Sequence, residues 1–181
     1  MNRRDELHNE VKSSIAIALF QLMEHKSFSD ITITEIILRA GVARASYYRN
    51  YKSKEDIIMY FLDESVKSFT SAPLANLSRE GAIRVHAVRL LKHTALYKRE
   101  LRSLFKAGLS GMFLDSLNRV FEEFSPNKFT GEKLKWIRYS HAGTLFNIIY
   151  MWIGSDMKES PEDIADSFMF FADKMREINY M

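Results

Sequence analysis

The residues of this 181-residue chain best suited to chemistry are cations that gather between positions 36 and 54, where there is no Asp or Glu. The cations are Arg39, Arg44, Arg49, Lys52 and Lys54. Ser, Tyr and Asn side chains lie between them. All of these groups hydrogen-bond to the phosphates and base edges of duplex DNA. The stretch is therefore the first candidate for a nucleic-acid-binding surface.

Two short helices joined by a tight turn are expected to position these side chains. Thr34 is suited to cap a helix that begins at Glu35, and Gly41 supplies the left-handed residue that ends it. Val42 then fits between two crossing helices, and residues 44–51 favour a second helix because they contain no Gly or Pro. The pattern is typical of a helix-turn-helix.

The order of residues in this stretch closely resembles the DNA-binding signature of the tetracycline-repressor (TetR/AcrR) family. The resemblance rests on Ile33-Thr34-Glu35-Ile36, on Ala40-Gly41-Val42 and on Ser46 to Glu55, and it covers about the first third of the chain. It implies a two-fold dimer that reads paired half-sites of double-stranded DNA. It also implies a set of DNA-binding residues, which are Thr34, Arg44, Ala45, Ser46, Tyr47, Tyr48, Arg49, Asn50 and Lys54. Within that set, Thr34, Tyr48 and Lys54 are expected to hold the DNA backbone.

Two departures from the family pattern concern the second helix. The position after Gly41-Val42 is commonly Ser, whereas Ala43 has no side-chain oxygen to cap the helix, which costs roughly 0.5–2 kcal/mol. Arg49 and Asn50 replace the usual aromatic-His-aromatic character near the helix end. Operator preference is therefore not transferable from relatives.

The composition is that of an ordinary soluble protein. Hydrophobic residues make up 46% of it, Cys is absent and the net charge is +3. Residues 1–64 carry nine Lys or Arg against ten Asp or Glu, so only the local acid-free stretch supports DNA binding. No signal-peptide core follows the N-terminus, and the apolar run 145–153 is too short to span a bilayer. These features predict a cytoplasmic protein without export.

The remaining sequence predicts helices throughout, so the expected fold is all-α with about nine helices. An N-terminal three-helix helix-turn-helix domain (1–52) precedes a helical bundle for dimerisation and effector binding (53–181). A first helix is expected at about 5–25, and Ser53 with Asp56 caps the next one. Ser160, Pro161 and Asp163 start the last helix. The bundle helices are expected at about 80–97, 98–106, 111–124, 131–153 and 161–179.

The last two of these helices carry more apolar surface than one core needs. This excess predicts an isologous four-helix dimer interface. The candidate interface residues are Ile148, Trp152, Ile164, Phe168, Phe171 and Met175. The alternative is a monomer in which a central helix is buried on all sides.

Aromatic and Met side chains between positions 105 and 150 favour a cavity for a small apolar effector. The candidate lining is Phe105, Met112, Phe113, His141, Phe146 and Tyr150. Residues 79–106 carry eight Lys or Arg and two acids. A solvated face is the favoured interpretation of that run, with an anionic effector or a second DNA contact as alternatives.

Other functional classes receive less support. The His residues lack the i, i+4 pairing of a helical metal site, so neither a metal nor a cofactor is expected. An enzyme is disfavoured because the chain has no Gly-rich phosphate loop, Cys nucleophile or paired carboxylates in a recognisable setting. The expected function is a ligand-responsive repressor. The alternative is an adaptor that acts through a protein partner, which the loss of the cap at Ala43 supports.

Overall fold

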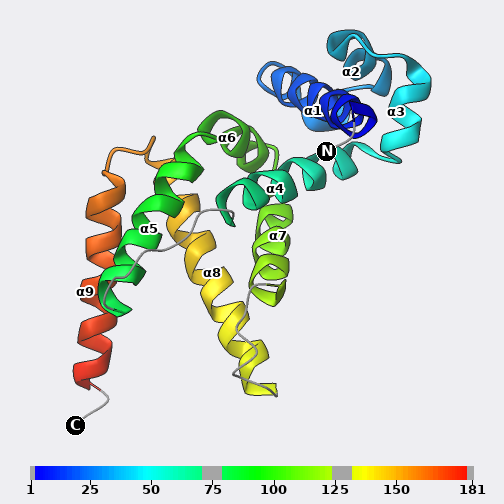
Figure 1. The fold of residues 1–181 in the computed structure, drawn as a ribbon. Coiled ribbons are helices and arrows are strands. Elements are labelled where there is room, and N and C mark those ends of the chain that lie inside the picture. The colour runs from blue at the N-terminus through cyan, green and yellow to red at the C-terminus, as the bar shows by residue number, and fades with distance from the viewer. Residues whose placement is uncertain (1–2, 71–78, 124–131, 179–181) are drawn as a thin grey trace.

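A computed structural model describes residues 3–70, 79–123 and 132–178 of the chain. These residues form α-helices and one short 3₁₀ helix, and they contain no strand, which confirms the predicted all-α class (Figure 1). The helices are α1 (Arg3–Met23), η1 (Phe28–Asp30), α2 (Ile33–Ala40), α3 (Arg44–Asn50), α4 (Lys54–Thr70), α5 (Arg79–Ala95), α6 (Lys98–Lys106), α7 (Ser110–Glu123), α8 (Glu132–Gly154) and α9 (Pro161–Ile178).

The first four helices enclose an N-terminal core. Apolar residues at three- and four-residue steps put one face of each helix inside this core. Its fully buried side chains are Ile15, Leu19, Ile31, Ile36, Tyr47, Ile57, Ile58 and Leu62. Each buried aliphatic side chain of this size contributes about 1.5–3 kcal/mol. The core therefore holds α2 and α3 in a fixed relation to α1 and α4.

Two predicted helix starts are confirmed by their hydrogen bonds. At α4, the Asp56 N–H donates to Ser53 Oγ at 3.2 Å, and the Ser53 N–H donates to Asp56 Oδ2 at 3.0 Å. At α9, the Asp163 N–H donates to Ser160 Oγ at 3.1 Å, and Pro161 is the first helical residue. Both starts satisfy N–H groups that an uncapped helix leaves without partners.

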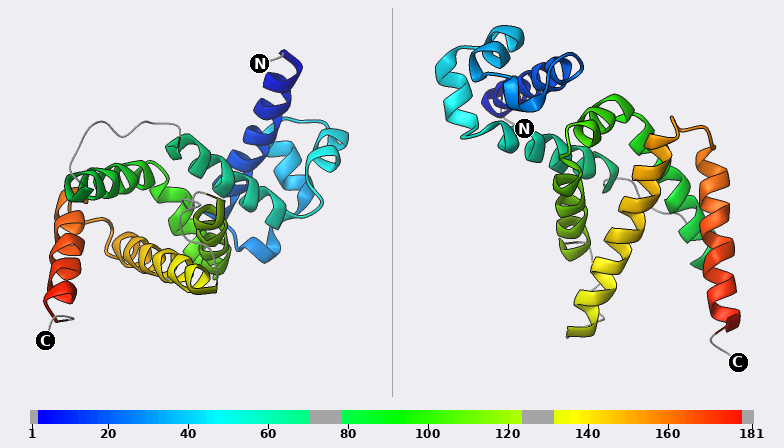
Figure 2. Two further views of the ribbon diagram at one scale, coloured as in Figure 1. Left: turned by 60° about the horizontal axis from the view of Figure 1, so that its bottom comes forward. Right: turned by 180° about the vertical axis from the view of Figure 1, so that it is seen from behind.

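The C-terminal helices pack in two pairs, α5 against α9 and α7 against α8. Figure 2 shows the α5–α9 pair on one side of the molecule and α7 with α8 on the other. α4 packs against both α1 and α7, and α6 packs against α8 and α1. An ion pair between Arg119 and Asp63, at 2.8 Å, joins α7 to α4. Through these contacts α4 connects the N-terminal core to the bundle.

Helix α5 has two faces with different neighbours. One face carries Arg84 and Lys92, which pair with acids of α9: Arg84 Nη2 donates to Asp166 Oδ2 at 2.8 Å, and Lys92 lies 2.6 Å from Glu162. The opposite face presents side chains at three- and four-residue steps toward α4 and α7. These side chains are His86, Arg89, Leu90, His93 and Thr94. A single helix thus separates a polar contact with α9 from the interior of the bundle.

Candidate nucleic-acid interface and ligand cavity

The first helix of the helix-turn-helix begins two residues earlier than the sequence predicts. Thr32 is the N-cap of α2: its Oγ1 accepts the N–H of Glu35 at 3.2 Å, and its own N–H donates to Glu35 Oε2 at 2.8 Å. Thr34 is an exposed residue of the first turn and caps nothing. Glu35 explains why Thr32 and not Thr34 is the cap, because a capping box needs Glu three residues after the capping residue.

Glu35 also forms an ion pair with Lys26, which precedes η1. Lys26 Nζ lies 2.8 and 3.0 Å from the two carboxylate oxygens. This hydrogen bond from Lys26, followed by those from the backbone and hydroxyl of Thr32, lowers the pKa of Glu35 to about 2. Since a carboxylate held by donors is favoured in its charged form, the start of α2 is fixed at neutral pH.

The turn between α2 and α3 has the predicted left-handed glycine. Gly41 has φ 65° and ψ 30°, and its N–H points to the carbonyls of Ile37 and Leu38. A residue with a Cβ is strained in this conformation. Ala43 follows with the extended backbone of an N-cap, but its side chain caps nothing, as the sequence predicts. Helix α3 therefore begins without a side-chain cap.

Helix α3 places some of its predicted DNA-binding residues outward. Arg44, Ala45, Tyr48 and Arg49 are exposed. Arg44 Nη2 donates to the hydroxyl of Tyr48 at 3.2 Å, and the guanidinium carbon lies 5.5 Å from the ring centre. The outer face therefore combines two guanidinium groups with a phenol, and these groups suit phosphates and base edges.

Tyr47 does not belong to this outer face. Its side chain is 0% exposed, whereas Tyr48 is 51% exposed, and it packs edge-on against Tyr48 with ring centroids 5.3 Å apart. The predicted DNA contact by Tyr47 is wrong for this conformation, because the ring is a central part of the N-terminal core. Helical phase gives the signal: Tyr47 lies four residues before Tyr51, which is also buried.

Asn50 and Ser46 occupy the edge of the face and bond to each other within the helix. Asn50 Nδ2 donates to the Ser46 carbonyl at 2.7 Å, and both residues are half-buried. Both residues are less exposed than Arg44 and Arg49. The exposed face of α3 therefore consists of Arg44, Ala45, Tyr48 and Arg49.

Lys54 lies where its ammonium group binds the protein backbone. Its Nζ donates to the carbonyls of Phe28 at 2.5 Å, Ile31 at 2.8 Å and Ser29 at 3.3 Å, and it lies 4.6 Å from the Phe28 ring centre. These bonds use all three donors of an ammonium group. The sequence-based role of Lys54 at the DNA backbone is corrected to a role inside the N-terminal unit, because its donors satisfy the carbonyls around η1.

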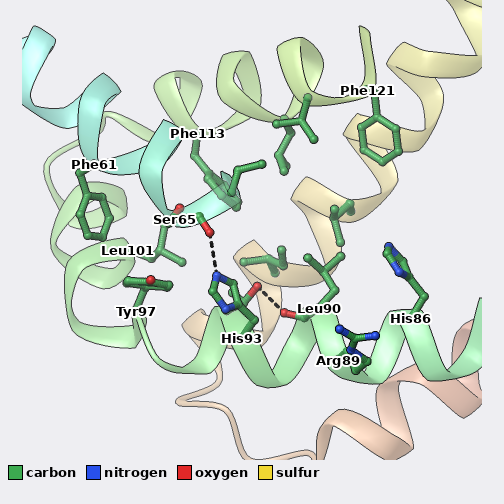
Figure 3. Close-up of a pocket in the computed structure, with 16 residues that line it drawn as sticks. Phe61, Ser65, His86, Arg89, Leu90, His93, Tyr97, Leu101, Phe113 and Phe121 are labelled. Atoms are coloured by element: carbon green, nitrogen blue, oxygen red, sulfur yellow. Dashed lines mark hydrogen bonds between the residues drawn. The ribbon is translucent and has the colours of Figure 1, made fainter. Parts of the chain in front are cut away.

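A cavity of about 420 Å³ lies between helices of the bundle (Figure 3). Helix α4 contributes Phe61, Ser65 and Val66, and α5 contributes the face described above. The other lining residues are Tyr97, Leu101, Phe113, Leu117, Val120, Phe121, Leu145 and Ile149. The volume falls within the range of about 300–1,000 Å³ of ligand sites. The cavity is largely apolar.

The lining differs from the one that the sequence predicts. Of the six predicted residues only Phe113 lines the cavity. Phe105, Phe146 and Tyr150 instead form an aromatic cluster in which ring centroids lie 5.0–6.4 Å apart. Met112 packs against the core, and His141 is exposed and stacks on Phe121 at 6.0 Å. Sequence reasoning missed the contributions of α4 and α5, because residue type alone does not indicate which apolar faces leave a space.

One hydrogen bond crosses the cavity wall from α5 to α4. His93 Nε2 lies 2.7 Å from the carbonyl oxygen of Ser65, which accepts only, so the ring nitrogen is the donor (Figure 3). The His93 ring also meets Tyr97 edge-on at 5.2 Å. His93 therefore holds α4 and α5 together at the cavity.

The predicted dimer residues divide into two groups. Trp152 is only 4% exposed and its Nε1 donates to the Glu159 carbonyl at 2.9 Å, and Ile148 and Ile164 pack against the same core. Trp152 is therefore covered within one chain, whereas Ile148 and Ile164 are only partly buried there and stay candidates for the interface. Phe168 is half-buried and Phe171 is 61% exposed. The side chain of Met175 lies outside the described residues.

Other apolar side chains of the last two helices reach solvent. They are Trp136, Ile137, Tyr139, Tyr150, Met151 and Phe170. The excess of apolar surface that the sequence predicts is thus present, but it is carried mostly by different residues. In the part of the chain that the structure describes, no helix is both long enough and apolar enough to cross a bilayer.

Comparison with known proteins identifies the N-terminal unit. Residues 17–60 match the family described as bacterial regulatory proteins, tetR family. The N-terminal part of the chain therefore resembles the tetR family of regulators. The match spans the helices from the second half of α1 to the first turns of α4, and therefore includes the whole helix-turn-helix. It agrees with the expectation that the chain is a regulator rather than an enzyme.

One relative extends the likeness beyond the helix-turn-helix. The uncharacterized HTH-type transcriptional regulator YxbF of Bacillus subtilis (strain 168) is 26% identical over 161 residues, which make up 85% of this chain. The aligned part covers 42% of the length of that relative.

Two solved structures share the fold. Lin0861 from Listeria innocua superposes with a TM-score of 0.71 at 16% identity, over 97% of this chain and 94% of its own. A TetR transcriptional regulator from Streptococcus agalactiae 2603V superposes with a TM-score of 0.60 at 17% identity, over 93% and 96% of the two chains.

Proposed function

We propose that the protein is a ligand-responsive transcriptional repressor that acts as a dimer in the cytoplasm and binds a palindromic DNA operator through α3. The observation that carries this proposal is the outer face of α3, where Arg44, Tyr48 and Arg49 are exposed. A rigid core lies behind that face, and no acid occurs between residues 36 and 54. A short helix with these groups fits the major groove and repels no phosphate.

The DNA-binding test compares Arg44→Ala with Lys106→Ala. Lys106 is an exposed cation on α6 and serves as the matched loss of charge. Fragments recovered from bacterial genomic DNA by the purified protein define the operator. We expect Arg44→Ala to weaken operator binding by about 1–3 kcal/mol and to relax selection at one base position. Unchanged affinity and sequence preference in Arg44→Ala would contradict the assignment of α3.

We place DNA binding in residues 1–52 and dimerisation with ligand sensing in residues 53–181. Exposed apolar side chains of α8 and α9 support a dimer, with Phe170 and Phe171 on α9 as its centre. Two-fold symmetry would present two α3 helices to half-sites about 34–36 Å apart.

Analytical ultracentrifugation tests the dimer. Phe171→Glu places a charge in a contact that excludes water, which is costly, and should yield a monomer that keeps its helix content. Leu96→Glu is the control, because Leu96 is exposed and lies between α5 and α6, outside the proposed interface. A wild-type monomer at micromolar concentration would contradict this part of the proposal.

Helix α4 supports a route from the cavity to the DNA. Phe61, Ser65 and Val66 line the cavity, while Ile57, Ile58 and Leu62 of the same helix are buried in the N-terminal core. A ligand that prefers one position of α4 shifts the separation of the two α3 helices only by its differential affinity. A coupling of about 1–3 kcal/mol would release the operator about 5–150-fold.

Reciprocity provides the test of ligand control. A ligand that weakens operator binding by a given factor must itself bind more weakly, by the same factor, when operator is present. Fluorescence anisotropy of labelled operator and calorimetry of the ligand measure the two factors. If a ligand binds the cavity stoichiometrically and operator affinity stays constant, the proposal of ligand control is contradicted. The proposal of DNA binding is not affected by that result.

A further inference from the structure

Several arginines and lysines of the helical bundle pair with acids. In the basic run of residues 79–106, Arg84 and Lys92 pair with acids of α9, and Arg102 lies 2.8 Å from Asp156. A carboxylate at this distance balances much of the charge of the cation. These members of the run therefore join helices, rather than forming a solvated face or a surface for an anion.

The two exposed arginines of α3 form no ion pair with any residue that the structure describes, and they differ from each other. Arg44 has a neutral partner: its Nη2 donates to the Tyr48 hydroxyl at 3.2 Å, and its guanidinium carbon lies 5.5 Å from the centre of the Tyr48 ring. The side chain of Arg49 forms no hydrogen bond within the described part of the chain. Arg44 is therefore held in one direction by Tyr48, whereas Arg49 is not.

The ring of Tyr48 is itself anchored to the N-terminal core. It packs edge-on against the buried ring of Tyr47, with centroids 5.3 Å apart, and Tyr47 packs against the buried Tyr51 at 6.1 Å. Aromatic pairs of this kind favour a defined ring orientation. Residues four apart lie on the same side of a helix, so the anchored hydroxyl of Tyr48 is within reach of Arg44.

The bond to Tyr48 leaves Arg44 able to present two parallel donors. A guanidinium group has five N–H donors. Nη2 carries one N–H on the side of Nε and one on the side of Nη1, and each forms a two-donor edge with its neighbour. A single bond to a hydroxyl occupies one of these edges, so the other edge remains complete.

Two parallel donors distinguish between the bases of the major groove. Guanine presents two neighbouring acceptors, N7 and O6, whereas adenine presents an acceptor beside a donor. Thymine offers one acceptor and cytosine offers a donor. The free edge of Arg44 therefore matches guanine.

We propose that Tyr48 is a positioning residue that directs Arg44 at a guanine in each half-site of the operator. This inference rests on the proposed binding of DNA through α3, and it names the base that is read and the residue that orients the reader. An arginine that is oriented before binding loses less side-chain freedom when it docks. Arg49, which lacks such a partner, contacts a phosphate.

The first experiment identifies the base that Arg44 reads. The operator that genomic fragments define is randomised within each half-site, and the purified full chain selects from this library. Fluorescence anisotropy then gives the affinity for single duplexes. We expect guanine at one position of each half-site, and an affinity about five- to a hundredfold lower when adenine replaces it. Arg44→Ala should abolish the preference at that position.

Tyr48→Phe keeps the ring and removes only the hydroxyl that accepts from Arg44. We expect this variant to lower the preference for guanine about two- to tenfold, which is the range of one hydrogen bond. Its affinity for duplexes without this guanine should stay unchanged. In the Arg44→Ala background Tyr48→Phe should have no further effect, because the hydroxyl acts through Arg44. A hydroxyl that contacts a phosphate would instead weaken all duplexes alike, and its effect would add to that of Arg44→Ala.

Arg49→Ala is the matched control, because it removes the same group from the same face of α3. We expect it to weaken binding to all duplexes alike and to keep every base preference. The slope of the logarithm of affinity against the logarithm of salt concentration should fall by about one.

Four results would overturn the inference. They are a base other than guanine at the position that Arg44→Ala relaxes, a guanine preference that Tyr48→Phe leaves unchanged, additive effects of Tyr48→Phe and Arg44→Ala, and a lost base preference in Arg49→Ala. If the wild type selects a defined site together with one of these results, only the inference is contradicted. If the wild type selects no site, the proposed function is contradicted as well, so the two failures are distinguishable.

Discussion

Lys54→Met tests whether this lysine supports the fold or the DNA. Methionine keeps most of the side-chain length that packs on Phe28 and removes the three donors. Of the three bonds, those to Phe28 and Ile31 are partly buried, whereas the bond to Ser29 is exposed, so water replaces the last most readily. Hydrogen bonds of a charged donor are worth about 1.5–3 kcal/mol. Because solvent partly reaches the carbonyls after relaxation, we expect a total loss of about 1.5–3 kcal/mol.

The position in α4 supports the same magnitude. Lys54 is the first residue of this helix, where the helix dipole disfavours a cation. The carbonyls around η1 compensate for that unfavourable location. For a chain of this length the loss corresponds to a fall in melting temperature of about 3–12 °C.

Lys52→Met is the matched control. Lys52 lies two residues earlier and is exposed, so its replacement removes the same charge and should change the unfolding free energy by less than about 0.5 kcal/mol. Unfolding in urea, followed by circular dichroism, measures both variants. The salt dependence of operator binding should keep its slope in Lys54→Met, since no phosphate contact is lost. A variant as stable as wild type, with a slope smaller by about one, would refute this reasoning and restore the DNA contact.

Three further outcomes follow from the helix-turn-helix. Ala43→Ser should raise the melting temperature, because a hydroxyl at the N-cap of α3 contributes about 0.5–2 kcal/mol; an unchanged transition would mean that the new hydroxyl does not bond to the helix. Tyr47→Phe removes a buried hydroxyl that bonds to no described protein group and should raise stability by about 1 kcal/mol with unchanged operator affinity; loss of operator binding in a folded variant would return Tyr47 to the interface. The lowered pKa of Glu35 stabilises the native state above the unfolded pKa of about 4.5, and this stability disappears as the pH falls toward about 2. Glu35→Gln should therefore flatten the acid limb of a melting temperature measured between pH 2 and pH 6, and an unchanged limb would exclude the ion pair with Lys26 as its cause.

Sequence patterns predicted the parts of the fold that depend on neighbouring residues. Gly41 ends α2 because of its backbone freedom, and the Ser53 and Ser160 caps depend on acids three residues away. Ala43 lacks a capping atom whatever surrounds it. Such signals are local, so one sequence is sufficient to read them.

Long-range partners explain the errors in the candidate site. The sequence predicted that Lys54 contacts the DNA backbone, but the carbonyls that it binds lie 23–26 residues earlier in the chain. Tyr47 was assigned to the DNA contact by the family resemblance, and Trp152 to the dimer interface by the excess of apolar surface on the last two helices, although burial depends on which helix packs against each side. The cavity was expected among aromatic residues after position 105, yet α4 and α5 supply half of its walls. Hydrophobic periodicity shows that a helix has an apolar face, but it does not show which other helix packs against that face.

The two-faced arrangement of α5 has a consequence for how such a protein diversifies. Mutations at positions 86, 89, 90 and 93 alter the lining of the cavity, whereas the ion pairs between α5 and α9 depend on positions 84 and 92. Side chains that share no partner usually change stability independently. Substitutions during evolution can therefore change the side chains that contact a small molecule while the ion pairs between α5 and α9 are kept. New ligand preferences can arise in this way without a loss of stability.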